Sequence, residues 1–283
     1  SSDLRGQGPG EYTDINAFAV NASLHQLVIY DNMKQSLMFY STEDGRFVKS
    51  EKFNKPTPAE IAYWGGYFFY HNRLHRNYQD DISLHYYLLA SKDGITIGKR
   101  YFKHENNKED YPFSPSGHNL YDNNSKLYYC RDFDNIVYQI HEDSVVPRFR
   151  INLPNPLPAS MIEERPNEMS LLRSGYSLGI TDIYEYGGLL FFRFVKDGYI
   201  WSCLYNVEES KQVYCAKRIK FLDSSLIDTI DGIYKDCFYS ILTPEYLDYA
   251  FSENPLEDYP DLFKTYDVEG DNPVIAFYRA VVR

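Results

Sequence analysis

Residues 27–31 read Leu27-Val28-Ile29-Tyr30-Asp31, a short apolar run that ends in an aromatic and a polar residue. Runs of the same kind recur four times along the chain, as Tyr67-Phe68-Phe69-Tyr70-His71, Leu127-Tyr128-Tyr129-Cys130-Arg131, Leu189-Leu190-Phe191-Phe192-Arg193 and Asp236-Cys237-Phe238-Tyr239-Ser240. A turn signal precedes each run, and further short runs rich in Tyr, Phe, Val and Ile lie before and after it. Because no apolar stripe of helical period persists, the pattern predicts strands and argues against a helical solenoid.

The spacing of these runs indicates the architecture. Their polar end positions follow one another at intervals of 40, 60, 62 and 47 residues. Four short antiparallel strands in about 40–50 residues are the period of a β-propeller blade. We therefore expect an all-β propeller of four-stranded antiparallel blades in a single domain over 1–283. Its units are approximately 15–54, 58–104, 117–155, 176–223 and 226–283, and loop insertions over 72–81, 104–117 and 154–175 account for the wider intervals.

The last unit differs from the others. Residues 273–279 supply its third strand, and the chain ends four residues later without a fourth. A helix is expected within 244–267, since Pro244 suits a first helical turn and Gly270 follows. An open sheet edge invites aggregation. Two alternatives stay open: a five-bladed ring with unusual closure, or a six-bladed ring whose N-terminal blade lies outside this chain.

Composition excludes several classes of protein. The 283 residues include 28 Tyr, 18 Phe and 2 Trp, which a disordered chain does not carry. The net charge of −11 argues against general binding of nucleic acid. No apolar run is long enough for a transmembrane segment. The chain begins at Ser1 without a leader, so the residues themselves do not give the compartment.

Two of the four cysteines lie symmetrically about a polar turn. Cys203 and Cys215 flank Glu209, and they face each other if this segment is a hairpin. Most antiparallel cross-strand sites fit disulfide geometry poorly, which favours two unpaired thiols. The sequence leaves both alternatives open.

The segment Gly6-Gln7-Gly8-Pro9-Gly10-Glu11-Tyr12 carries the clearest motif. It resembles the glycine signature of a six-bladed β-propeller family from Gram-negative gut anaerobes, related in architecture to NHL-repeat propellers. The sequence patterns of residues 136–153 and 271–278 are similar to those of the same family. The resemblance implies that the complete protein has six blades, of which about five are represented in this chain, and that an N-terminal blade is missing. It also implies an exported protein of the cell envelope, periplasmic or outer-membrane-anchored, with a lipid anchor on a missing N-terminal Cys. The functions of most members are unknown. The glycines themselves predict a turn between blades, because neither a helix nor a Lys follows to bind phosphate.

Polar residues occupy one register of the five units. We expect a ring of side chains and neighbouring loop residues at one mouth of the channel: Asp31, His71, Arg73, Arg131, Asp132, Arg193, Lys196 and Ser240. Two Arg with an Asp and a His can hold a carboxylate, a phosphate or a polar sugar. Long insertions at the same face favour binding. The alternative is a set of strand-end residues that face water or form salt bridges.

Catalytic and metal-binding signatures are weak. His71 and His75 are four residues apart, but no Glu follows His71 as in a zinc-binding helix. The chain has no Gly-x-Ser-x-Gly segment, and its 40 acids single out no carboxylate pair. We predict no cofactor and a non-catalytic exported module that binds a glycan, peptide or protein partner at the channel mouth. The alternatives are a metal-dependent lactonase or hydrolase, with Asp31 or Glu11 as a ligand, and a scaffold without a small ligand.

Overall fold

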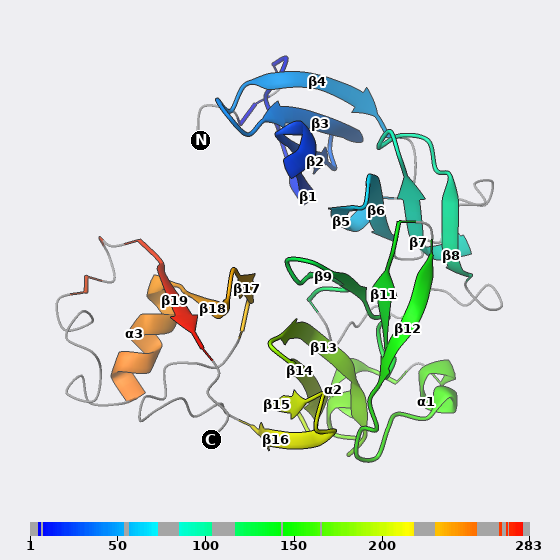
Figure 1. The fold of residues 1–283 in the computed structure, drawn as a ribbon, viewed down its shortest axis with the longest axis vertical. Helices are drawn as coiled ribbons and strands as arrows, with labels where there is room; N and C mark the ends of the chain where they lie inside the picture. The colour runs from blue at the N-terminus through cyan, green and yellow to red at the C-terminus, as the bar shows by residue number, and fades with distance from the viewer. Residues whose placement is uncertain are drawn as a thin grey trace.

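The computed structural model contains five antiparallel sheets arranged one after another around a common centre (Figure 1). It describes residues 5–6, 8–53, 57–72, 85–103, 117–142, 144–164, 166–217, 230–253, 266–267, 270 and 272–279. The first strand of each sheet lies nearest the centre, and the fourth lies at the periphery. This arrangement is a β-propeller, which confirms the predicted fold, and its described part has five blades.

The first four blades each have four strands in chain order. The first contains β1 (Ile15–Asn21), β2 (Gln26–Asp31), β3 (Ser36–Ser41) and β4 (Phe47–Lys52), with a short 3-10 helix, η2 (Ala22–Leu24), after β1. The second contains β5 (Pro58–Trp64), β6 (Tyr67–Asn72), β7 (Tyr86–Ser91) and β8 (Lys99–Lys103). The third contains β9 (Leu120–Asp122), β10 (Leu127–Tyr129), β11 (Ile136–Ile140) and β12 (Val145–Arg150). The fourth contains β13 (Ser177–Tyr186), β14 (Leu189–Lys196), β15 (Tyr199–Asn206) and β16 (Lys211–Ala216).

The fifth blade has three described strands, β17 (Gly232–Tyr234), β18 (Cys237–Leu242) and β19 (Val274–Tyr278). A helix, α3 (Pro244–Glu253), lies between β18 and β19 in sequence, as predicted. Residues 254–265 lie outside the described part, so the expected end of this helix is not tested. Leu247 and Ala250 of α3 are buried with Leu242 of β18.

The insertion over 154–175, expected as a loop, contains two short helices, α1 (Ala159–Glu163) and α2 (Glu168–Leu172). The Asn167 side chain caps α2 by accepting a hydrogen bond from Ser170 N at 2.9 Å. Leu171 is the buried residue of α2. A helix of five residues is too short to show an apolar period in the sequence, which is why both helices were missed.

Aromatic side chains fill the spaces between blades. Phe53, which follows β4, lies between Tyr30 of the first blade and Tyr70 of the second, with ring centroids 6.0 and 5.0 Å away. All three rings are buried, and the Tyr70 hydroxyl donates to Gly94 O at 2.6 Å. Tyrosine thus supplies apolar area while its hydroxyl finds a partner at the edge of the core.

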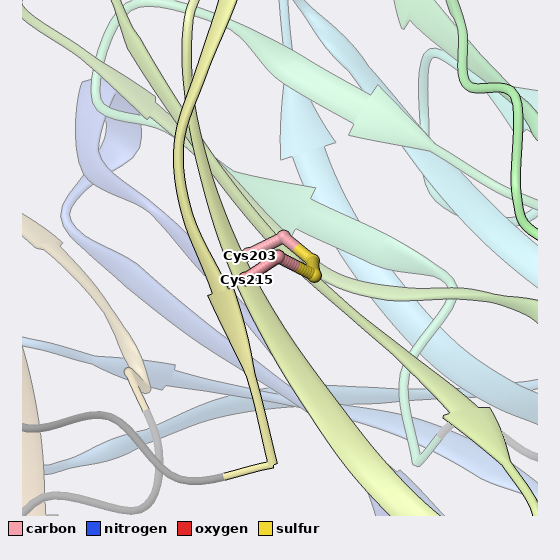
Figure 2. The surroundings of a disulfide bond; sticks show 2 residues. All are labelled: Cys203 and Cys215. Carbon is pink, nitrogen blue, oxygen red and sulfur yellow. A yellow bond between two sulfur atoms is a disulfide. The ribbon is translucent and has the colours of Figure 1, made fainter.

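A disulfide joins Cys203 on β15 to Cys215 on β16 (Figure 2). The two residues are direct partners in the antiparallel ladder, and their Cα atoms are 4.1 Å apart. The expectation of two unpaired thiols is therefore wrong. The hairpin register placed the two side chains on one face, which residue spacing alone left open.

The glycine motif forms a turn against the outer part of the first blade. Gly8 N donates to the Glu11 carboxylate at 2.7 Å, and the Tyr40 hydroxyl donates to Gly10 O at 3.2 Å. Gly10 has a φ of +79°, and a Cβ atom there would lie 2.8 Å from Phe47. Positive φ and close contact explain the requirement for glycine at this position.

Candidate functional site

Most of the predicted ring residues are held by contacts with their neighbours. Asp31 closes β2 and is fully buried, and its carboxylate accepts hydrogen bonds from Thr13 N at 2.6 Å and Lys34 N at 2.9 Å. Burial raises the pKa of Asp31, but the hydrogen bonds from Thr13 and Lys34 outweigh it and leave the pKa below its ordinary value. Asp31 thus anchors the segment before β1 to the first blade.

The second and third blades meet at another ring position. His71 of β6 is buried, and its Nδ1 lies 3.2 Å from the Tyr129 hydroxyl of β10. Asp132 accepts a hydrogen bond from the Asn119 amide at 3.2 Å. The contact between His71 and Tyr129 joins the second blade to the third, whereas the hydrogen bond between Asn119 and Asp132 lies within the third blade.

Both ring arginines form ion pairs inside their own blades. Arg131 binds Asp134 through Nε and Nη2, at 3.0 and 2.7 Å. Arg193 of β14 donates from Nε to Asp182 of β13 at 2.8 Å. A ligand at the ring would compete with these carboxylates for the guanidinium groups.

The remaining ring positions are dispersed. The Lys196 Nζ atom lies 3.9 Å from a carboxylate oxygen of Asp197. Ser240 is fully buried in β18, and Arg73 lies outside the described residues. Among the described residues, the charged side chains of the predicted ring are paired within their own blades and do not form one cluster.

A cavity of about 310 Å³ lies near the centre, among the inner strands of the third, fourth and fifth blades. Figure 1 shows β9, β13 and β17, the first strands of these three blades, close to the centre of the ring. The lining residues are His118, Leu120, Tyr121, Asp122, Asn124, Tyr184, Asp231, Gly232, Ile233 and Tyr239. Polar side chains from three blades thus meet in one space.

Two carboxylates belong to this lining. Asp122 ends β9 and accepts a hydrogen bond from Asn124 N at 3.0 Å. Asp231 precedes β17 and accepts one from Ile241 N at 2.6 Å. Burial raises the pKa of Asp122, against a smaller opposing effect of the Asn124 hydrogen bond. The described lining contains no Lys or Arg, so the cavity wall is acidic when both groups are ionised.

Three tyrosines complete the polar wall, and one of them, Tyr121, donates from its hydroxyl to His118 O. Tyr184 of β13 is buried and donates from its hydroxyl to Asp231 O at 3.0 Å. Tyr239 of β18 lies against Gly232, where a Cβ atom would come within 2.6 Å of its hydroxyl. Burial, then Asp231 and Asp122, raise the pKa of Tyr239, so this phenol keeps its proton at neutral pH. It can donate a hydrogen bond into the cavity.

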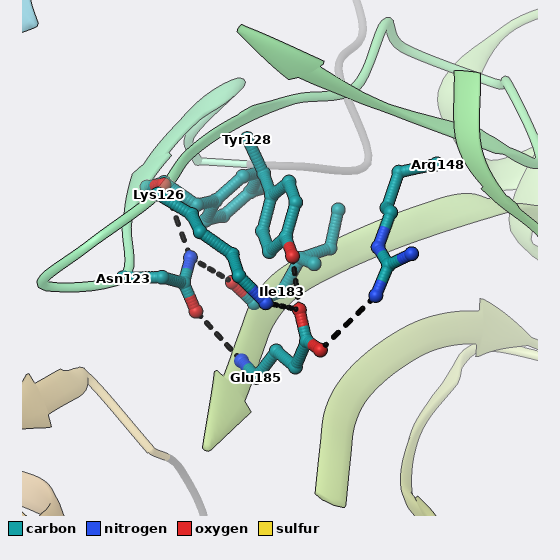
Figure 3. A network of polar contacts seen from close by, with 7 residues as sticks. Asn123, Lys126, Tyr128, Arg148, Ile183 and Glu185 are labelled. Atoms are coloured by element: carbon teal, nitrogen blue, oxygen red, sulfur yellow. Dashed lines mark hydrogen bonds and ion pairs between the residues drawn. The ribbon is translucent and has the colours of Figure 1, made fainter. Parts of the chain in front are cut away.

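A polar network fixes the third blade to the fourth beside this cavity (Figure 3). Glu185 of β13 accepts hydrogen bonds from Lys126 Nζ at 2.8 Å and from the Tyr128 hydroxyl, and it pairs with Arg148 at 3.5 Å. The buried Asn123 side chain donates to Ile183 O at 3.1 Å and accepts from Glu185 N at 2.6 Å. These bonds set the position of β13, and with it Tyr184.

Sequence reasoning missed this cavity. None of the residues that line it belongs to the predicted ring of polar side chains. Their position in the repeat could have indicated them. Asp122 and Asp231 lie at the ends of the first strand of their units, and first strands line the channel of a propeller.

The described residues contain no group of three or more His, Cys, Asp or Glu side chains placed to hold a metal ion. His75, a partner in the weak His71–His75 spacing, lies outside them. No helix in the described part of the chain is long and apolar enough to cross a membrane.

The fold defines this protein as a β-propeller. Residues 3–279 match the family described as "Domain of unknown function (DUF4934)", and the chain belongs to that family. The crystal structure of a "putative exported protein" from Bacteroides fragilis is similar, with a TM-score of 0.76 at 17% identity over 96% of this chain and 79% of that one. A member of the DUF4221 family from Bacteroides vulgatus aligns at a TM-score of 0.47 and 11% identity, over 75% of this chain and 69% of that one. No curated protein matches the sequence.

Proposed function

We propose that this protein is a non-catalytic, exported binding module that takes a glycan, peptide or protein partner at the mouth of its channel. The cavity among β9, β13 and β17 carries the proposal, because it gathers carboxylates, phenols, an amide and an imidazole from three blades in about 310 Å³. Concave sites with a few convergent polar groups are typical of ligand binding. The ring residues at the blade ends would contribute as a rim.

Two observations support export. The Cys203–Cys215 disulfide is of the kind that persists in oxidising compartments. The similar structure from Bacteroides fragilis carries the description of an exported protein. We place the protein in the cell envelope, periplasmic or outer-membrane-anchored through a lipidated cysteine, in line with the family resemblance.

The complete ring is proposed to have six blades of the NHL-like kind. Phe18 and Val20 on β1 are 63% and 52% exposed, on the face opposite the alanines that pack against the second blade. Ile275 and Phe277 on β19 are 56% and 52% exposed, on the face away from the fourth blade. Each is a sheet face with exposed apolar side chains, which a further blade would cover. The test compares amide hydrogen exchange in β1 and β19 between this chain and a longer gene product. A further blade would slow the exchange in both strands.

A thermal-shift screen tests the function. Glycans, short peptides, acidic metabolites and divalent ions are each added to the wild-type protein, because a ligand of the native state raises its melting temperature by mass action. The shift should fall in variants of the cavity wall, such as Tyr239→Phe, and of the rim, such as Arg131→Ala. A screen without any shift would contradict binding, and hydrolysis of a lactone that depends on a divalent ion would favour the enzyme alternative.

A further inference from the structure

We infer that the central cavity recognises a positively charged group, an ammonium or a guanidinium, at the end of its ligand. This inference rests on the proposed binding function and selects a ligand chemistry within it. The observation behind it is the composition of the wall, where Asp122 and Asp231 stand among three tyrosines, Tyr121, Tyr184 and Tyr239, without a Lys or Arg in the described lining. Carboxylates and aromatic faces together are the groups that bind organic cations.

The strands around the cavity use their own cations elsewhere. Lys126 and Arg148 bind Glu185, and Arg193 binds Asp182. Each of these pairs lies outside the lining. The charge of the cavity wall therefore comes from Asp122 and Asp231, and a cationic ligand would be attracted to both carboxylates.

The cavity also has the polar groups that orient such a ligand. Asn124 and His118 are among its lining residues, and the absence of a side chain at Gly232 leaves room for the Tyr239 hydroxyl. Both carboxylates line the same cavity as Tyr239, and after the larger effect of burial both raise the pKa of this tyrosine. An ammonium has three donors and no acceptor, so these carboxylates, the amide oxygen and the phenol oxygen can all accept from it.

Calorimetric titration of the whole chain tests the inference. The probes are Nα-acetyl-lysine amide, its uncharged analogue Nα-acetyl-norleucine amide, and agmatine as a guanidinium without a peptide backbone. We expect the lysine compound to bind about tenfold more tightly than the norleucine compound, as one additional ion pair in a cleft allows. Comparable binding of agmatine would show that the charged group suffices, whereas preference for the lysine amide would assign the ligand to peptides.

Two variants and a matched control make the test specific. Asp122→Asn and Asp231→Asn should each lower affinity for the lysine compound about fivefold or more, because each removes one charge from the wall. Asp236→Asn removes a charge from the β17–β18 turn outside the lining and should leave affinity unchanged. Each carboxylate accepts one backbone hydrogen bond, from Asn124 N and from Ile241 N, and Asp122 is the more exposed of the two residues, so its variant carries less risk to folding.

The outcomes separate the inference from the proposed function. Equal binding of the norleucine compound, or unchanged affinity in both cavity variants, overturns the cation inference. A neutral glycan that binds while all three probes fail would also overturn it and leave the binding function intact. Absence of binding by probes and by every compound of the thermal-shift screen would contradict both.

Discussion

Arg193 donates from Nε to a carboxylate oxygen of Asp182 over 2.8 Å and thereby joins β14 to the innermost strand of the fourth blade. Asp182 has a φ of +53°, at a point where the register between these strands shifts. The two side chains are 18% and 15% exposed. A charge expected to face a ligand is therefore used to stabilise an irregularity in the strand that carries Tyr184 to the cavity.

Replacing Arg193 with alanine should lower the free energy of unfolding by about 2 kcal/mol, because a mostly buried carboxylate loses its partner. Urea denaturation measures the change. The double variant Arg193→Ala/Asp182→Ala should cost less than the two single losses added together, since the pair acts as a unit. Strict additivity would show that the ion pair contributes nothing. The control is Lys49→Ala, which breaks an exposed pair with Glu51 and should cost less than about 0.5 kcal/mol.

Glu185→Gln should destabilise the contact between the third and fourth blades by about 2 kcal/mol. The buried carboxylate accepts from Lys126 and Tyr128 and pairs with Arg148, and a neutral amide cannot satisfy all three. The unfolding midpoint in urea measures this loss, with the exposed Glu209→Gln as a control. A midpoint equal to that of the control would mean that the network does not stabilise the fold.

Ionisation of Asp31 should make the free energy of unfolding depend on pH in the acidic range. Its pKa in the folded protein lies below the ordinary value of 3.8, so the unfolded chain binds more protons near that pH. The contribution is present above the ordinary value and is lost as the pH falls through the lower, folded value. Melting temperatures from pH 7 to pH 3 should therefore drop less steeply for Asp31→Asn than for the wild type. An unchanged slope would contradict this role.

The disulfide should stabilise the fourth blade. Cys203 and Cys215 are 12 residues apart, and closing a loop of this length in the unfolded chain is worth about 2–3 kcal/mol. The double variant Cys203→Ala/Cys215→Ala should unfold at lower urea by that amount, and reductant should have no further effect on it. Cys237→Ala, which removes a free cysteine, is the control. If reductant leaves wild-type stability unchanged, the disulfide does not contribute to it.

Gly232→Ala should disturb the cavity wall. A Cβ atom at this position would lie 2.6 Å from the Tyr239 ring, so the ring or the strand must move, at a cost of about 1–3 kcal/mol. Gly98→Ala provides the comparison, because the nearest atom there, Ala90 O, is 3.9 Å away. Tyrosine fluorescence and the melting temperature report the change, and equal behaviour of both variants would show that Tyr239 is not held by this contact.

The sequence by itself determined the strands and their grouping into blades. Turn residues and runs of β-branched and aromatic side chains are local signals, so Leu27–Asp31 and its four repeats could be recognised without any knowledge of contacts. The same locality explains the predicted helix after Pro244.

Only the tertiary structure decided which side chains meet. Asp122 and Asp231 are more than a hundred residues apart, and the curvature of the ring brings their strands to one cavity. Likewise, the register of the β15–β16 hairpin places Cys203 opposite Cys215. A register shift between β13 and β14 lies at Asp182, the residue with which Arg193 pairs. Register and long-range closure depend on the packing of whole sheets, and a one-residue slip moves a side chain to the other face. For that reason the repeat predicted the propeller, while the candidate site emerged from the folded ring.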